Sequence, residues 1–286
     1  MRSKLFVPGS RPELFSKALA SAADALSVDL EDAVLESRKA QARGHVEQFL
    51  RDAQGSGKTI IVRTNPVGSV HFEHDVMAIA RDGLNILNIP KVEDPAEVHA
   101  AEKMLEKAER EFKVAHPIAL LVNIESPKGL RCAAGLAAAS PRVMGLQIGY
   151  GDLFSPLGID RRDQAGVQAV MFSVRMAAGE AGVAAIDGAF TDVADMDGFV
   201  AEAEMARRLG YLGKSCIHPK QIAAANQVFR PSDADITHAL SVLEQLDNVE
   251  QKGLGAFVVE GKMVDAPLFE RAKAIVRQAR ALGIIQ

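Results

Sequence analysis

The fold is indicated most clearly by two stretches of the sequence: IALLVNIESPKG at residues 118–129 and VMGLQIGYGDLFSPLG at residues 143–158. Each begins with an apolar run that is typical of a strand buried on both faces. Each run is followed by a single acid, Glu125 after the first and Asp152 after the second. A helix-length segment separates the runs, as in a strand–helix–strand unit with parallel strands. The two acids therefore come at matching strand ends, where they are expected to share one divalent ion.

The same alternation of short apolar runs and longer amphipathic segments continues from end to end of the chain. Eight strand–helix units can be counted, with a strand roughly every 30 residues. The expected strands cover residues 4–8, 25–30, 59–66, 85–92, 118–124, 143–149, 182–188 and 212–219. Eight such units favour a TIM barrel, an α/β fold, over an open doubly wound sheet.

Polar residues recur where the expected strands end, which supports a barrel because barrel active sites lie at that face. An ordinary loop also begins with polar residues, so a single case proves little, but the repetition is harder to dismiss. The residues in question are Asp29, Asp32, Arg63, Asn65, Lys91, Glu125, Asp152, Asp187, Lys214 and His218.

The strand–helix rhythm stops after Phe229. Residues 1–230 are expected to form the barrel, and residues 231–286 a C-terminal extension made of a helix, a hairpin and a second helix. The hairpin is predicted in AFVVEGKMVDAP, with its turn at Glu260 and Gly261. So small an extension cannot bury a comfortable core of its own. It is therefore expected to pack on the barrel or on a neighbouring subunit.

The composition excludes several classes of protein. The chain has 286 residues and a net charge of −4, which offers no basic stripe for nucleic acid. No window has the roughly 18 apolar residues that a membrane helix needs. The N-terminal apolar run is too short for a signal peptide. Cys132 and Cys216, far apart in the sequence, make no disulfide framework, so a cytoplasmic, reducing location is expected.

The acids Glu125 and Asp152 predict a metal site. Either acid by itself is read equally well as a helix N-cap or as part of a loop salt bridge. Together at adjacent strand ends they indicate a shared cation, since a buried carboxylate is costly unless it is paired or bound to metal. Only oxygen ligands are present, with no histidine beside them, so Mg²⁺ fits better than Zn²⁺.

Arg63 ends the otherwise apolar strand IIVRT. It is either part of a structural ion pair or a bidentate clamp on a carboxylate or enolate, and the clamp is favoured. Asp29, Glu31 and Asp32 form an acid cluster in which strand alternation puts Asp29 and Glu31 on one face. Only one or two of these acids are expected in the site.

Seven motifs, spread in order over the whole chain, resemble those of the HpcH/HpaI aldolase and citrate lyase superfamily. The similarity is greatest to the citrate lyase β-subunit-like branch, near malyl-CoA lyase. The resemblance implies a TIM barrel with a C-terminal extension, assembled as a homotrimer or homohexamer. The motifs are LFVPGSRPELFSKA (5–18), VDLEDAV (28–34), VRTNP (62–66), NIESPKG (123–129), GYGDL (149–153), GKSCIHP (213–219) and GKMVDAP (261–267).

The resemblance also implies roles for residues at the matching positions. Glu125 and Asp152 would bind Mg²⁺. Arg63 would hold the 2-oxo acid substrate and act in catalysis, with Glu125 against the same substrate. Asp29 and Asp32 would order the waters around the metal, Asp29 as part of the substrate-binding set and Asp32 as part of the catalytic set.

Three further residues receive roles from the resemblance alone. Asp265, in the GKMVDAP motif, would enter the site of a neighbouring subunit as a catalytic acid or base. Arg11 and Lys17 would lie at the contacts with coenzyme A.

The implied activity is that of a Mg²⁺-dependent carbon–carbon lyase. Such an enzyme would cleave a 3-hydroxyacyl-CoA, of the citryl-, malyl- or citramalyl-CoA type, to acetyl-CoA and a 2-oxo acid. Two alternatives stay open: a class II aldolase that acts on free hydroxy-keto acids, and a subunit that is active only with an acyl-carrier partner. Which hydroxy acid is cleaved stays open as well.

Overall fold

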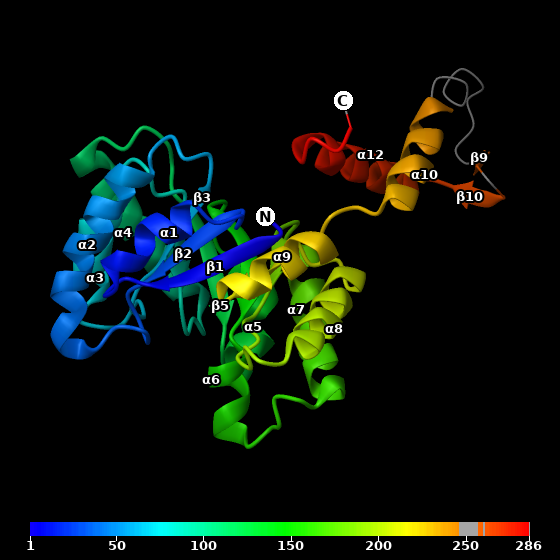
Figure 1. Cartoon of the computed structure of the whole chain (residues 1–286). Helices are drawn as coiled ribbons and strands as arrows, with labels where there is room; N and C mark the ends of the chain where they lie inside the picture. The colour runs from blue at the N-terminus through cyan, green and yellow to red at the C-terminus, as the bar shows by residue number, and fades with distance from the viewer. Residues whose placement is uncertain (246–256, 260, 286) are drawn as a thin grey trace. The chain divides into compact units, whose positions relative to one another are not determined.

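The computed structural model describes residues 1–245, 257–259 and 261–285 (Figure 1). The chain divides into two compact units, Met1–Phe229 and Arg230–Gln286. The larger unit contains the barrel, and the smaller one corresponds to the C-terminal extension.

Eight parallel strands close into a barrel, which confirms the predicted TIM-barrel fold. Each strand pairs with the next one along the chain, and the last pairs with the first through Ser3↔Lys214 and its neighbours. In chain order the strands are β1 (Ser3–Pro8), β2 (Ala25–Asp29), β3 (Thr59–Arg63), β4 (Ile86–Ile89), β5 (Ala119–Ile124), β6 (Val143–Ile148), β7 (Ala184–Asp187) and β8 (Gly213–Cys216).

Strand residues alternate between the helices outside the barrel and its interior. In β3, Ile60 and Val62 pack in the main hydrophobic core with the helices, whereas Ile61 belongs to a second, inner cluster. Ile86 and Leu121 join Ile61 in that inner cluster. The strands are thus buried on both faces, which is why they appear in the sequence as short, nearly continuous apolar runs.

Helices follow the strands and cover the outside of the barrel (Figure 1). They are η1 (Pro12–Leu14), α1 (Phe15–Leu19), η2 (Glu36–Arg38), α2 (Lys39–Ala53), α3 (Phe72–Ile79), α4 (Pro95–Phe112), α5 (Pro127–Ala138), α6 (Tyr150–Phe154), η3 (Ser155–Leu157), α7 (Gln164–Glu180), α8 (Met196–Arg208) and α9 (Pro219–Val228). Side-chain caps begin several of them: Asp94 makes a capping box at α4, and Ser126 accepts a hydrogen bond from the amide of Gly129 in α5.

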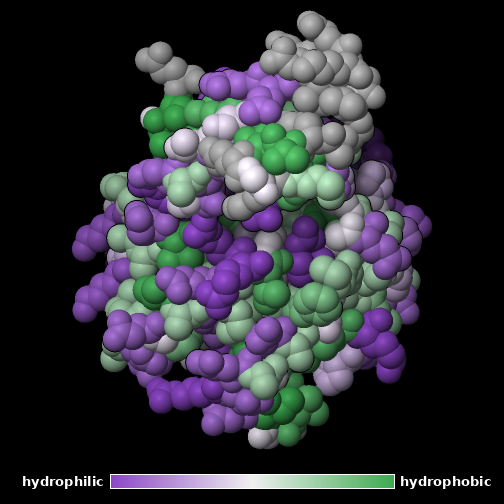
Figure 2. Space-filling model, turned by 90° about the vertical axis from the view of Figure 1, so that its right-hand side faces the viewer, coloured by the Kyte–Doolittle hydropathy of each residue, from purple (hydrophilic) through white to green (hydrophobic). Residues whose placement is uncertain are grey.

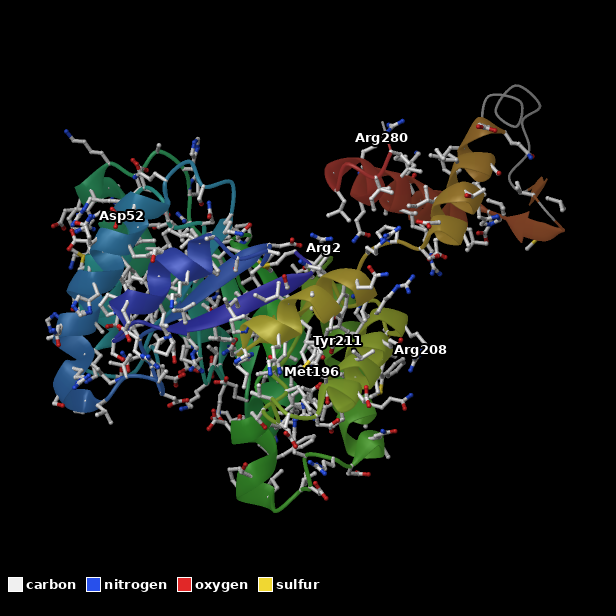
Figure 3. The ribbon with its side chains drawn as sticks, in the orientation of Figure 1. Arg2, Asp52, Met196, Arg208, Tyr211 and Arg280 are labelled. Atoms are coloured by element: carbon white, nitrogen blue, oxygen red, sulfur yellow. The ribbon has the colours of Figure 1, made fainter. Side chains whose placement is uncertain are left out.

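Polar contacts tie the barrel strands to neighbouring segments. Nη2 of Arg2 donates to a carboxylate oxygen of Asp24 at 2.8 Å, which joins the residues just before β1 and β2. The hydroxyl of the buried Tyr211, just before β8, donates to the carbonyl of Met171 in α7 at 2.8 Å. Arg2 and Tyr211 are labelled in Figure 3.

The C-terminal unit contains the predicted helix, hairpin and helix. Its elements are α10 (Asp233–Glu244), β9 (Phe257–Val259), β10 (Lys262–Val264) and α12 (Ala266–Ala281). The two strands pair antiparallel, and Gly261 at their turn has a φ of 76°, whereas Glu260 lies outside the described residues. The small core of the C-terminal unit includes Ala239, Val242, Val264, Ala272 and Val276. The surface on which this unit packs stays a prediction.

Hydrophilic and hydrophobic side chains are interspersed over the face of the molecule shown in Figure 2. Among the helices that the structure describes, none combines the length and the apolar character required to cross a membrane.

Candidate active site

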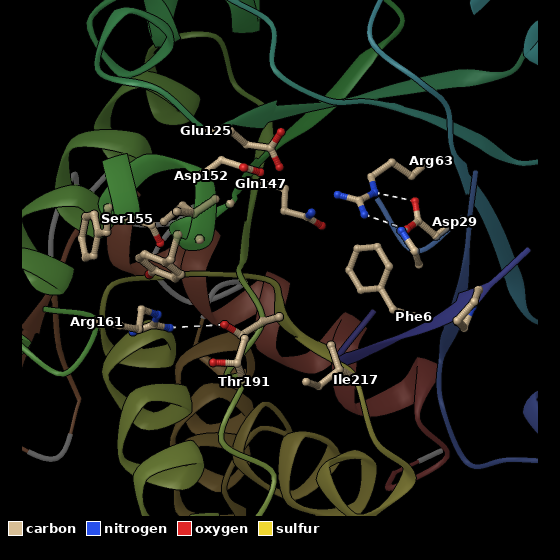
Figure 4. A pocket seen from close by; sticks show the side chains of 18 of the residues that line it. Phe6, Asp29, Arg63, Glu125, Gln147, Asp152, Ser155, Arg161, Thr191 and Ile217 are labelled. Carbon is tan, nitrogen blue, oxygen red and sulfur yellow. Dashed lines mark hydrogen bonds and ion pairs between the residues drawn. The ribbon is translucent and has the colours of Figure 1, made fainter. Parts of the chain in front are cut away.

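A pocket of about 540 Å³ lies at the carboxyl ends of the barrel strands (Figure 4). Asp29 at the end of β2 and Arg63 at the end of β3 line one part of it, and Glu125 and Asp152 line another. Four side chains that the sequence assigned to the site therefore meet in one cavity. This is the face on which barrel enzymes carry their active sites.

The carboxylate of Glu125, which follows β5, is held by two neutral N–H groups. Nδ2 of Asn123 donates to Oε1 at 3.0 Å, and the backbone amide of Lys91 donates to Oε2 at 2.9 Å. Lys91 has a φ of 53°, the left-handed region that a residue with a Cβ seldom adopts. Such strain is concentrated at functional sites, and here it accompanies an amide that points at the carboxylate.

Burial raises the pKa of Glu125 above its ordinary value, the charge of Arg63 opposes that rise, and the nearby Asp152 adds to it. Glu125 is only 4% exposed. Among the described residues, no cation lies within ion-pair distance of its carboxylate. A buried carboxylate without a cation of its own fits a bound metal ion.

Asp152 lies in the first turn of α6, beside Glu125 in the close-up view (Figure 4). Within the described part of the chain its carboxylate makes no hydrogen bond and no ion pair. Together the two acids form a small cluster of negative charge that opens on the pocket. Two carboxylates with open positions around them suit Mg²⁺, which keeps several waters or substrate oxygens among its ligands.

In residues 1–245, 257–259 and 261–285, no third His, Cys, Asp or Glu side chain joins Glu125 and Asp152 in a group placed to hold a metal. A hard cation held by these two acids would keep positions for water or substrate oxygens, as Lewis-acid catalysis requires.

Asp29 and Arg63 form a bidentate ion pair. Nε and Nη2 of Arg63 each donate to a different oxygen of Asp29 at 2.7 Å (Figure 4). The backbone amides of Glu31 and Ala33 also donate to this carboxylate, both at 3.0 Å. Burial by itself would raise the pKa of Asp29, but the charge and hydrogen bonds of Arg63 outweigh it and leave that pKa below its ordinary value.

The other two acids of the cluster contact the same cations. Glu31 lies 2.8 Å from Nη1 of Arg63 and 2.8 Å from Nζ of Lys91, although neither of its oxygens makes a well-aligned hydrogen bond. Burial raises the pKa of Glu31 to about 7, against the charge of Arg63. Asp32 is more exposed and accepts a hydrogen bond from Lys91 at 3.2 Å. Asp29 lines the pocket, whereas Glu31 and Asp32 contact Arg63 and Lys91 and do not line it.

Six of the ten polar strand-end residues do not line the pocket, contrary to the expectation that such residues gather in it: Asp32, Asn65, Lys91, Asp187, Lys214 and His218. Asn65 is buried and accepts a hydrogen bond from the ammonium of Lys39 at 2.6 Å. Asp187 and Lys214 form a fully buried ion pair. The reason is strand alternation: Ile186 points into the barrel, so the next residue, Asp187, points outward toward the helices.

The three residues assigned from resemblance alone lie at the following places. Arg11 and Lys17 are exposed on the segment after β1, and Arg11 pairs with Glu13 at 2.8 Å. Asp265 is the N-cap of α12 and accepts from the amide of Leu268 at 3.3 Å. Their roles in binding and catalysis stay predictions.

Sequence reasoning missed several polar residues that line the pocket, among them Gln147 in β6 and Arg161. Arg161 donates to both oxygens of Glu202 at 2.7 Å, and its guanidinium lies 4.0 Å from the ring centroid of Tyr150. Gln147 lies in a strand that is buried on both faces, so the sequence has no period-2 pattern to show that this side chain faces the pocket.

The profile of the HpcH/HpaI aldolase/citrate lyase family matches residues 2–219, which include the whole barrel. The chain belongs to this family. The match covers more than half of the chain and agrees with the order of motifs from one end of the barrel to the other. Membership confirms the resemblance that the motifs indicated.

Individual members of the HpcH/HpaI aldolase/citrate lyase family are similar over nearly the full length. The L-malyl-CoA/β-methylmalyl-CoA lyase of Cereibacter sphaeroides is 34% identical, over 99% of this chain and 95% of that protein. The citrate lyase subunit beta of Leuconostoc mesenteroides subsp. cremoris is 32% identical, over 99% and 95%.

The fold of this family member also matches a solved structure. The protein CitE of Mycobacterium tuberculosis, determined in complex with magnesium, acetoacetate and coenzyme A, superposes with a TM-score of 0.74. The two are 30% identical, and the match covers 98% of this chain and 100% of that one.

Proposed function

We propose that this protein is a Mg²⁺-dependent carbon–carbon lyase. Its substrate is a 3-hydroxyacyl-CoA of the citryl-, malyl- or citramalyl-CoA type, and its products are acetyl-CoA and a 2-oxo acid. The observation that carries the proposal is the pair Glu125 and Asp152, two neighbouring carboxylates that form no ion pair with any described residue and lie in the same pocket as Arg63. The similarity to a malyl-CoA lyase and to a citrate lyase subunit supports the same activity.

Glu125 and Asp152 would hold the ion, which when bound supplies Lewis acidity toward the oxygens of the 2-oxo acid. Arg63 presents a positive charge to the same part of the pocket. Asp29 locks its guanidinium in place through two hydrogen bonds, so little reorganisation is needed when negative charge develops on the substrate. Arg63 would thus bind the carboxylate of the 2-oxo acid and stabilise the oxygen that becomes its carbonyl.

Cleavage requires that the 3-hydroxyl of the substrate lose its proton, and it leaves an enolate of the acetyl thioester, which must gain one. A water ordered by Asp29 or Asp32 would accept the hydroxyl proton. Asp265, from the extension of a neighbouring subunit in a homotrimer or homohexamer, would donate a proton to the enolate. Arg11 and Lys17, exposed beyond β1, would bind the phosphates of coenzyme A. Because Cys132 and Cys216 are both free, we place the enzyme in the cytoplasm.

A substrate screen tests the proposal. The purified protein is incubated with citryl-, malyl- or citramalyl-CoA and Mg²⁺, and the released 2-oxo acid is measured. Release from one thioester, lost with EDTA, is the expected result. Cleavage of free hydroxy-keto acids without coenzyme A would identify a class II aldolase instead. Activity that appears only with an added acyl-carrier protein would identify a subunit of a larger enzyme.

A further inference from the structure

Beneath the pocket, the barrel contains buried polar side chains that the proposed reaction does not use. Lys4, Asn88, Asn123 and Gln147 come from four different strands, and none is more than 3% exposed. The interior of a TIM barrel is ordinarily packed with branched apolar residues. A layer of buried polar side chains inside the barrel therefore departs from the usual packing.

Lys4 in β1 is the most costly member of this layer because its side chain is fully buried. Its ammonium donates to Oε1 of Gln147 and lies 4.2 Å from the ring centroid of Phe6. In the part of the chain that the structure describes, no carboxylate lies within ion-pair distance of it. Burial lowers the pKa of Lys4 well below its ordinary value, and the charge of Arg63 lowers it further.

A continuous chain of hydrogen bonds leads from Lys4 to the carboxylate of Glu125. Lys4 donates to Oε1 of Gln147, whose Nε2 donates to Oδ1 of Asn123 at 3.1 Å. Nδ2 of Asn123 then donates to Oε1 of Glu125 at 3.0 Å. Asn88 reinforces the middle of the chain by donating to the same Oδ1 at 2.7 Å.

A backbone carbonyl, which can only accept a hydrogen bond, determines the direction of this chain. Nδ2 of Asn88 donates to the carbonyl of Leu121 at 2.9 Å and to Oδ1 of Asn123 at 2.7 Å, so the amide nitrogen of Asn123 faces Glu125. Turning over either amide, Gln147 or Asn123, would place two donors or two acceptors face to face. Turning over both would set the amide nitrogen of Asn123 against that of Asn88. One orientation satisfies all links, and it presents an N–H group to Glu125.

We propose that Lys4 is a positioning residue, which acts through Gln147 and Asn123 to fix the orientation of the Glu125 carboxylate. Lys4 does not line the pocket, so it acts through its partners. Because Nδ2 of Asn123 donates to Oε1 of Glu125, the carboxylate is held in an orientation that leaves it free to bind an ion in the pocket beside Asp152. The inference rests on the proposed function only in taking Glu125 as a ligand of Mg²⁺.

The test measures Mg²⁺ affinity by calorimetry on metal-free protein without substrate, so a wrong assignment of the thioester would not affect it. Lys4→Met keeps an unbranched side chain and removes the donor. We expect it to fold and to bind Mg²⁺ about tenfold more weakly, the scale on which partners of metal ligands act. In a Gln147→Met background, where the chain is already broken, Lys4→Met should weaken binding no further.

Two more variants complete the experiment. Lys4→Gln retains a donor toward Gln147 and should keep more of the affinity than Lys4→Met. Lys58→Met is the matched control, because that lysine lies just before β3, at the opposite end of the strands, and donates to the carbonyls of Ser21 and Ala23, which precede β2. It should leave Mg²⁺ affinity unchanged.

A Lys4→Met variant that binds Mg²⁺ as tightly as the wild type would overturn the proposal. The proposal would also fail if Lys4→Met weakened Mg²⁺ binding equally in the wild-type and Gln147→Met backgrounds, since the effect would then not pass through Gln147. If Lys4→Met fails to fold, Lys4→Leu, which also removes the donor, decides by the same comparison in the wild-type and Gln147→Met backgrounds. A wild-type protein that binds Mg²⁺ but cleaves no thioester contradicts the lyase assignment and leaves this comparison valid. A wild-type protein that binds no Mg²⁺ overturns both.

Discussion

Gly149 lies directly against Glu125. A Cβ at position 149 would be 2.3 Å from Oε1 and 2.4 Å from Cγ of Glu125, far inside van der Waals contact. The glycine therefore provides the space in which the carboxylate of Glu125 faces the pocket. The short sequence GYGDL thus serves both acids: its first residue makes room for Glu125, and its fourth is Asp152.

Gly149→Ala should displace the Glu125 carboxylate and weaken Mg²⁺ binding by about 10- to 100-fold, as expected when the support of a metal ligand is lost. Calorimetric titration of the metal-free variant measures this. Gly44→Ala is the control, because a Cβ at that position in α2 would meet nothing within 4 Å. Equal affinities in the two variants would show that the contact between Gly149 and Glu125 has no effect on the metal.

Arg63→Lys should raise the KM for the 2-oxo acid by about tenfold or more in the condensation direction. A lysine keeps the positive charge but lacks the planar guanidinium, which donates two hydrogen bonds to Asp29 and is thereby held in a fixed orientation toward a substrate carboxylate. Steady-state kinetics with varied 2-oxo acid gives the value. An unchanged KM would remove Arg63 from the substrate site and leave it a structural ion pair.

Glu31 should make the metal-free protein less stable as pH rises. Its folded pKa of about 7 exceeds the ordinary value of 4.5, so the folded state favours the protonated carboxyl. The contribution is favourable below pH 4.5 and is lost as pH rises through about 7. The Glu31→Gln variant lacks this titration, so its free energy of unfolding relative to wild type should increase over that range. Urea unfolding in EDTA at several pH values measures the difference, and parallel profiles would contradict it.

Mixing two inactive variants tests whether the extension completes a neighbour's site. Glu125→Ala removes a metal ligand, and Asp265→Ala removes the proposed acid. If each site combines residues from two chains, co-assembly of the two variants should produce some intact sites and restore part of the activity. The thioester cleavage assay after mixed refolding detects this. Activity that stays absent in verified mixed oligomers would place both residues in one chain's site.

The sequence was sufficient for the fold and for the principal acids of the site. Eight apolar runs at regular spacing are hard to arrange other than as a closed barrel. Closure brings the strand ends together, so Asp29, Arg63, Glu125 and Asp152 meet although nearly a hundred residues lie between the first and the third of them.

The sequence could not show whether a polar residue at the end of a strand faces the interior of the barrel or the helices outside it. Asp187 and Lys214 look like site residues in the sequence, but strand alternation sends them outward into a buried ion pair. Lys4 and Gln147 escaped notice for the opposite reason. In strands buried on both faces the period-2 pattern disappears, so a polar residue inside the barrel cannot be distinguished from one outside it.

The decisive measurement is thioester cleavage by the Glu125→Ala variant, because it shows whether Glu125 binds the Mg²⁺ that cleavage needs. Release of the 2-oxo acid from the preferred acyl-CoA is measured for wild type and variant, each with Mg²⁺ and with EDTA, after circular dichroism has shown that the variant folds. We predict Mg²⁺-dependent release by the wild type and none above background by Glu125→Ala. Mg²⁺-dependent release by the folded variant at the wild-type rate would contradict the assignment of Glu125 as the metal-binding carboxylate.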